Sequence, residues 1–207
     1  MKAIIVTCVL AFSGLAAVAV SGAEGRSALW MTFDRGLDYS RQIRTAQAAR
    51  GWSVVEEDAV SGNRLLRVDY RFDAPGQGSL LVFDLVPTTL EKIRLRVRVS
   101  RAAGGPLRVG LSANSVGGGG YVAPDVLVPA NGKWTTLEMD LSGQLSGIYA
   151  NGKRVQQERI SAEEIRKLAL ERIIVNVRLP AGADARAGGE FYVDFDLLEG
   201  FPPDDSE

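Results

Sequence analysis

Along most of the chain, apolar and polar residues alternate with a period of two. In KIRLRVRV, residues 92–99, apolar side chains occupy every second position and Lys or Arg the others. A period of two places the apolar set on one face of a β-strand, so such segments predict half-buried strands. The same alternation occurs in 29–34, 65–72, 107–112, 136–141, 173–179 and 191–197. Two more evenly apolar segments, 52–57 and 79–85, also predict strands.

Gly, Pro and Asn turns separate these segments, and about nine strands are predicted in all. Alternation of this kind is typical of antiparallel sheets with one solvated face. Many such strands in one domain predict an all-β fold, a two-sheet antiparallel β-sandwich of the jelly-roll type.

Two segments have helical patterns instead. Ser161 and Glu164 have capping-box spacing before an apolar run, which predicts a short helix over 161–170. Residues 38–50 predict a second helix that ends at Gly51. The dipeptide Asn151-Gly152 predicts a tight hairpin turn, because both residues accept positive φ. The sandwich is therefore expected to carry one or two short helices.

The first residues differ from the rest of the chain. One Lys precedes an apolar run that ends in small residues at positions 21–23, which predicts a secretory signal peptide over 1–23. A membrane anchor is disfavoured, because the run is short and rich in Ala and Gly. We expect a secreted or periplasmic protein with no membrane span, a sandwich domain over 24–200 and a polar tail over 201–207.

Composition excludes several chemistries. The chain has no His, and its single Cys is Cys8, inside the predicted signal peptide. Catalysis by Ser-His-Asp or Cys-His groups is therefore excluded, and so are disulfides within the predicted mature chain. The formal net charge is −1, so no nucleic-acid partner is expected.

Carboxylates are the main acid–base groups that remain for an enzyme. Glu138 and Asp140 lie two residues apart on one predicted strand face. The pair resembles the E-x-D core of some jelly-roll glucanases, but the further acidic residue of those enzymes is missing. We interpret the pair as surface residues and assign no catalytic residue.

Four glycines, 117–120, precede Tyr121. No Lys-Ser/Thr and helix follow them, which excludes a phosphate-binding loop. Two interpretations stay open. The segment is a long connection between strands, or it borders a ligand site where Tyr121 stacks on a flat ligand. In the second interpretation, Asn114 and Ser115 hydrogen-bond the ligand.

Arg94, Arg96 and Arg98 share one face of a predicted strand. They form either a cationic groove for an acidic polysaccharide or a solvated face with cross-strand ion pairs. The near-neutral charge of the chain favours the second interpretation. The expected partners are Asp69, Asp84, Glu138 and Asp140.

Several stretches in order resemble a known family. They are WMTFDRG, GNRLLRVDYRF, GSLLVFDL, KIRLRVRVS, PLRVGLSAN, GKWTTLEMDLSG and FYVDFDLLEG. Their succession resembles secreted carbohydrate-binding modules of the galactose-binding-domain-like jelly roll. The resemblance implies a β-sandwich that binds a polysaccharide or another glycan, alone or beside a partner enzyme.

Members of this family often hold one structural calcium ion between the first and last strands. The resemblance therefore implies Asp34 and Asp194 as calcium ligands. Arg35 departs from the pattern, because a second acidic residue is common there.

Three functions stay open at this point. The resemblance favours a secreted, non-catalytic carbohydrate-binding protein. The alternatives are a structural or protein-binding β-sandwich of the cell envelope and a carboxylate-dependent glycoside hydrolase.

Overall fold

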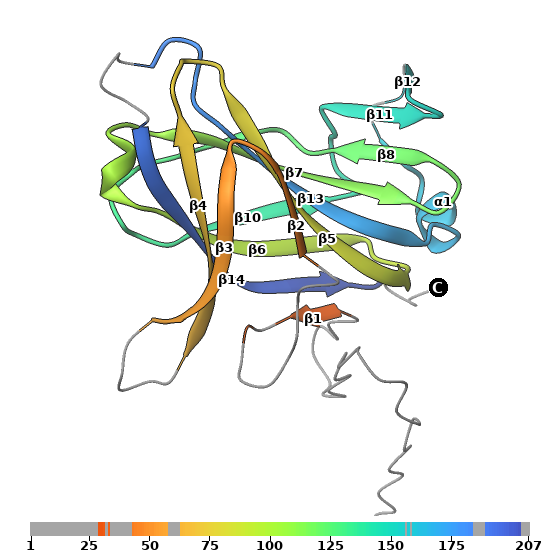
Figure 1. The fold of residues 1–207 in the computed structure, drawn as a ribbon. Helices are drawn as coiled ribbons and strands as arrows, with labels where there is room; N and C mark the ends of the chain where they lie inside the picture. Colours follow the sequence, from red (N-terminus) through yellow and green to blue (C-terminus); the bar gives the residue numbers. More distant parts are fainter. Residues whose placement is uncertain are drawn as a thin grey trace, which may run out of the picture.

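Two antiparallel sheets make up the fold. The computed structural model describes residues 29–31, 33, 43–57, 63–155, 157, 159–183 and 189–203. The six-stranded sheet has the order β10-β6-β14-β4-β3, and β1 also pairs with β14. The eight-stranded sheet has the order β12-β11-β8-β7-β13-β5-β2, and β9 also pairs with β7. Figure 1 shows the two layers, with β8, β11 and β12 at the upper right. The predicted β-sandwich is confirmed.

The six-stranded sheet consists of β1 (Leu29–Met31), β3 (Ala49–Glu56), β4 (Arg64–Phe72), β6 (Lys92–Val99), β10 (Thr135–Asp140) and β14 (Gly189–Phe201). The eight-stranded sheet consists of β2 (Ile43–Gln47), β5 (Gly78–Thr88), β7 (Leu107–Ser115), β8 (Gly119–Val122), β9 (Val126–Val128), β11 (Gly147–Ala150), β12 (Lys153–Val155) and β13 (Leu170–Arg178). The helical elements are the 3₁₀ turn η1 (Arg101–Ala103) and the helix α1 (Ala162–Arg166).

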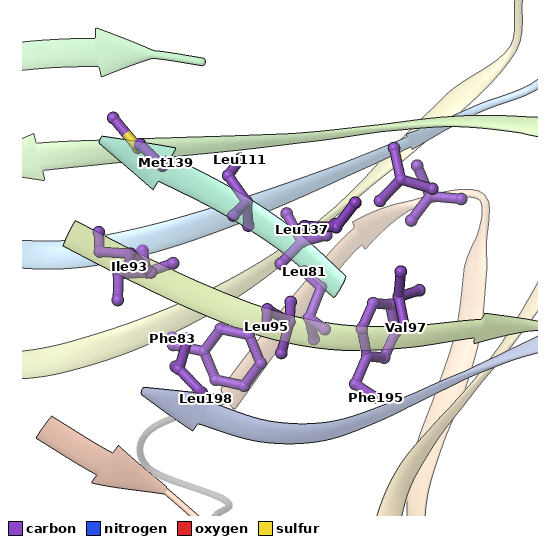
Figure 2. Packing of buried hydrophobic residues seen from close by; sticks show 14 of the residues in the cluster. Leu81, Phe83, Ile93, Leu95, Val97, Leu111, Leu137, Met139, Phe195 and Leu198 are labelled. Atoms are coloured by element: carbon purple, nitrogen blue, oxygen red, sulfur yellow. The ribbon is translucent and has the colours of Figure 1, made fainter. Parts of the chain in front are cut away.

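One hydrophobic core fills the space between the sheets. The apolar positions of the alternating segments face inward, and Leu95, Val97, Val109, Val175 and Val193 are fully buried in a single cluster. Figure 2 shows side chains of β6 and β10 packed with Phe195 and Leu198 of β14 and with Leu81 and Phe83 of β5. Burial of alternate side chains from both sheets is what holds the sandwich together.

The helix predicted over 38–50 is wrong where the structure describes the chain. Residues 38–42 lie outside the described residues, but Ile43–Gln47 is strand β2 and Ala49–Glu56 is strand β3. Ile43 pairs with Phe83 of β5 and is buried. A short isolated helix is only marginally stable in water. Pairing with β5 and burial of Ile43 therefore outweigh the helix propensity of this segment.

The other local predictions are confirmed. The Oγ of Ser161 accepts a hydrogen bond from the backbone N–H of Glu164, and the Glu164 carboxylate accepts one from the backbone N–H of Ser161. Helix α1 ends at Arg166, earlier than predicted, because Leu170 already pairs in β13. Asn151 and Gly152 have φ values of 49° and 74° and join β11 to β12.

The predicted signal peptide, residues 1–23, lies outside the described residues and stays a prediction, as do the last four residues of the predicted tail. Within the part of the chain that is described, no helix is long and apolar enough to cross a membrane.

Tyr70 carries an unusual hydroxyl group in this core. Its ring lies 5.8 Å from Phe72 and 5.7 Å from Phe191, centroid to centroid. The hydroxyl is buried with no hydrogen-bond partner among the described residues, and burial raises the pKa of Tyr70. We expect Tyr70→Phe to raise the free energy of unfolding by about 1 kcal/mol, because it removes an unsatisfied buried polar group. Urea denaturation measures this, and a clear loss of stability would contradict it.

Candidate functional site

A hollow of about 350 Å³ opens on the eight-stranded sheet, beside the turns that join β7 to β8 and β11 to β12. We call it the glycine hollow. The residues that line it include Gly118, Gly119 and Gly120 together with Asn114, Ser115, Tyr121, Tyr149, Glu171 and Arg172. The volume is in the range of small-molecule sites. The three sequence-predicted ligand residues, Asn114, Ser115 and Tyr121, thus all lie at one site.

The glycine run is divided between a turn and a strand. Gly117 and Gly118 have φ values of 95° and 87° and form the turn, whereas Gly119 and Gly120 begin β8. Positive φ favours glycine at the two turn positions. The interpretation of the run as a long connection is therefore wrong, because the β7–β8 hairpin is tight. The backbone N–H of Asn151 also donates to the Gly118 carbonyl at 3.3 Å, which joins the two hairpin turns.

Two hydroxyl groups pack directly against Gly119 and occupy the space where a side chain would lie. A Cβ atom at this position would lie 2.5 Å from the Oγ of Ser115 and 2.7 Å from the hydroxyl oxygen of Tyr121. Gly119 does not have a positive φ, so this space, and not backbone strain, is what a larger residue would change. Neither hydroxyl hydrogen-bonds another described residue, although Ser115 is buried. Both are available to a ligand.

Asn114 adds an amide group from the outer side of the sheet. It lies opposite Gly120 in the β7–β8 pairing, and its Oδ1 lies 3.6 Å from where a Cβ on Gly120 would be. The Asn114 side chain forms no hydrogen bond to the rest of the described chain. An unpaired amide offers two donors and one acceptor oxygen.

The two tyrosines of the hollow lie on opposite sides of the sheet. Tyr121 pairs with Ala113 and Ile148, which are buried, and its ring packs partly against the core. Tyr149 pairs with Gly120, so it lies on the outer side. Its ring covers Gly147, where a Cβ would lie 2.9 Å from a ring carbon. The ring on the outer side of the sheet is therefore that of Tyr149, which the sequence analysis did not single out.

The charged groups at the hollow pair with one another. Arg172 donates through Nε to Asp84 of β5 at 3.2 Å, and its other end lies 3.8 Å from the Glu171 carboxylate. Arg44 donates to both oxygens of Asp84 at 2.6 Å. The hydrogen bond from Arg44, together with the charges of Arg44 and Arg172, lowers the pKa of Asp84 despite its partial burial. Asp84 was expected beside the Arg94–Arg98 face but lies on the other sheet.

Asp194, the predicted calcium ligand on the last strand, is buried beneath two arginines. Its carboxylate accepts hydrogen bonds from Nε of Arg67 at 2.8 Å and from Arg98 at 2.8 Å, and the residue is 0% exposed. Two guanidinium groups at this carboxylate favour an ion-pair role over a cation site. Asp34 lies outside the described residues, and no group of three or more His, Cys, Asp or Glu in the described chain is arranged to hold a metal. The calcium ion stays a prediction.

The outer face of the six-stranded sheet is a network of ion pairs. Arg94 pairs with Glu138 at 2.7 Å, and Arg96 pairs with Asp196 at 3.0 Å. This agrees with the interpretation of a solvated, paired face, although Asp194 and Asp196 replace Asp69 and Asp84 as partners. The Asp140 carboxylate is occupied by the turn that follows it, where it accepts hydrogen bonds from Ser142 and Gly143.

Glu57 extends this network to Trp134. Its carboxylate accepts hydrogen bonds from Asn63, the indole N–H of Trp134 and Arg98. Burial alone would raise the pKa of Glu57, but these hydrogen bonds and the charge of Arg98 outweigh it and lower the pKa. The Trp134 ring also lies 4.5 Å from the Arg98 guanidinium, so it is committed to this network.

The two antiparallel sheets and their shared core define a β-sandwich of the jelly-roll type. Solved structures share this fold. An exo-β-agarase matches with a TM-score of 0.55 and 12% identity over 86% of this chain and 25% of that chain. The solution structure of CtCBM11 matches with a TM-score of 0.50 and 10% identity over 88% of this chain and 98% of that one.

A family 11 carbohydrate-binding module of the cellulosomal cellulase Lic26A-Cel5E of Clostridium thermocellum matches with a TM-score of 0.47 and 13% identity, over 90% of this chain and 100% of that one. The present chain spans a quarter of the length of the agarase. At these identities the likeness establishes the fold alone. No protein-family model and no curated protein matches the sequence.

Proposed function

We propose that this protein is a non-catalytic carbohydrate-binding protein whose glycine hollow binds a sugar unit of a glycan. One observation carries the proposal. Asn114, Ser115 and Tyr121 all line one hollow beside the backbone of Gly119 and Gly120, and their polar side-chain groups form no hydrogen bond to other described residues.

The chemistry of the hollow suits sugar hydroxyls. Each of its unpaired hydroxyl and amide groups can both donate and accept, as sugar hydroxyls do. The Tyr149 ring offers an apolar face for the C–H side of a sugar. Each hydrogen bond nets about 1 kcal/mol, so a few of them with one ring contact give weak, millimolar-to-micromolar binding.

Two further observations support binding without catalysis. Hydrolysis of glycosidic bonds generally uses two carboxyl groups across the cleft. Among the described residues that line the hollow, Glu171 is the one carboxylate, and it lies beside Arg172. The likeness in fold to CtCBM11, a carbohydrate-binding module, favours the same conclusion.

Gly119→Ala tests the proposal on a glycan array. The added methyl group occupies the space between the Ser115 and Tyr121 hydroxyls, so we expect binding to fall at least about tenfold, the loss of somewhat more than one hydrogen bond. Gly182→Ala is the matched control, because a Cβ there meets nothing within 4 Å and the backbone is unstrained. Circular dichroism verifies that both variants fold. Unchanged binding by folded Gly119→Ala, or no glycan bound by the unsubstituted protein, would contradict the proposal.

A further inference from the structure

The formal charges around the glycine hollow cancel. Arg44 and Arg172 are positive, Asp84 and Glu171 are negative, and the four side chains form one continuous chain of ion pairs. Among the described residues that line the hollow itself, Arg172 is the one cation. A ligand with a negative charge would therefore need Arg172 as its partner.

Arg172 is engaged from two sides. Its Nε donates to Asp84, which holds the guanidinium against β5, and its terminal nitrogen faces Glu171 at 3.8 Å. The register of β13 shifts between Leu170 and Arg172, so that Glu171 and Arg172 both line the hollow. The Glu171 side chain keeps 35% of its surface exposed, so a ligand in the hollow meets its negative charge.

We propose that the glycine hollow accepts uncharged sugar units and rejects units that carry carboxylate or sulfate groups, and that Glu171 is the residue that sets this selectivity. The inference rests on the proposed glycan binding. An acidic sugar would approach the Glu171 carboxylate, and Arg172, the one cation among the described lining residues, is already paired. Like charges at close range suppress binding. An uncharged sugar meets no such repulsion and uses the unpaired hydroxyl and amide groups.

The probes are β-1,4-galactan and mixed-linked β-1,3-1,4-glucan as uncharged polymers and polygalacturonate as the acidic polymer. We expect the unsubstituted protein to bind an uncharged polymer and to bind polygalacturonate at least about tenfold more weakly. Binding of the uncharged polymer should stay constant between about 0.01 M and 1 M salt, a range over which the Debye length falls from about 30 Å to about 3 Å.

Glu171→Gln removes the negative charge and keeps the shape of the side chain. The terminal nitrogen of Arg172 that faces Glu171 then has no negative partner on that side and can pair with the acidic polymer. We therefore expect the affinity for polygalacturonate to rise at least about fivefold at low salt and the gain to disappear in about 1 M salt. The ratio of the affinity for polygalacturonate to the affinity for the uncharged polymer should rise at least about fivefold. Glu163→Gln is the matched control, because it makes the same charge change on exposed helix α1, where Glu163 pairs with Lys167.

The outcomes separate the two proposals. An unsubstituted protein that prefers polygalacturonate, or a Glu171→Gln variant that matches Glu163→Gln, overturns the selectivity and leaves glycan binding intact. Failure of the unsubstituted protein to bind any of these polymers or a wider glycan array overturns both.

Discussion

Asp194→Ala is expected to lower the free energy of unfolding by about 3 kcal/mol. The Asp194 carboxylate lies beneath Arg67 and Arg98 and accepts hydrogen bonds from both. Breaking a buried ion pair by removing one partner costs about 3–5 kcal/mol, because the remaining charge is left without compensation. Both arginines keep some exposure to solvent, 29% and 21%, which places the expected loss at the lower end of this range.

Chemical denaturation measures the effect, and Asp73→Ala is the control. Asp73 pairs with Arg71 on the surface, where both side chains are about half exposed or more, and such pairs contribute little to stability.

The same comparison tests the predicted calcium ion. If arginine pairing is the role of Asp194, the loss is the same with and without chelator. A loss that disappears in chelator would identify Asp194 as a calcium ligand.

The sandwich fold was predictable because its signal is local. In β6, every second residue from Ile93 to Val99 is buried and the residues between them are not, which is the alternation seen in the sequence. The capping box of α1 and the Asn151-Gly152 turn are equally local. Segment 43–50 shows where prediction from local sequence patterns fails. Its Ala, Gln and Arg residues favour a helix, while the strand it forms depends on Phe83 and Val82, about 40 positions away.

The candidate site was predictable only in part for the same reason. Asn114, Ser115 and Tyr121 flank the glycine run closely in sequence, so they could be predicted as candidate ligand-binding residues from that local pattern. Tyr149 reaches the hollow through the pairing of β11 with β8, a long-range contact with no local signal. The Asn151-Gly152 turn placed Tyr149 beside a hairpin, but it did not say which strand lies next to it.

The partners of the arginine face show the same limit. The sequence placed Arg94, Arg96 and Arg98 on one strand face, but it did not show that β14 lies beside β6. That neighbour supplies Asp194 and Asp196, the carboxylates that pair with Arg98 and Arg96.

Tyr149 lies on the outer side of the sheet and Tyr121 on the side of the core. We therefore expect removal of the Tyr149 ring to affect glycan binding and removal of the Tyr121 ring to affect stability. Tyr149→Ala should weaken glycan binding at least about tenfold with little change in stability, because the ring lies on the outer side over Gly147 and its truncation leaves no cavity in the core. Tyr121→Ala should lower the free energy of unfolding by about 2 kcal/mol, less than for a fully buried aromatic, because the ring packs only partly against the core.

The phenylalanine variants separate ring from hydroxyl. Tyr121→Phe keeps the packing and removes the hydroxyl that faces Gly119, so stability should hold while binding weakens about fivefold, the worth of one hydrogen bond. Tyr149→Phe keeps the ring face and should retain most of the binding. Isothermal titration with the bound glycan and urea denaturation measure the two effects on the same samples. A Tyr149→Ala variant that binds as tightly as the unsubstituted protein would remove the outer side of the sheet from the site, and Tyr121→Phe would then show whether the hydroxyls over Gly119 act alone.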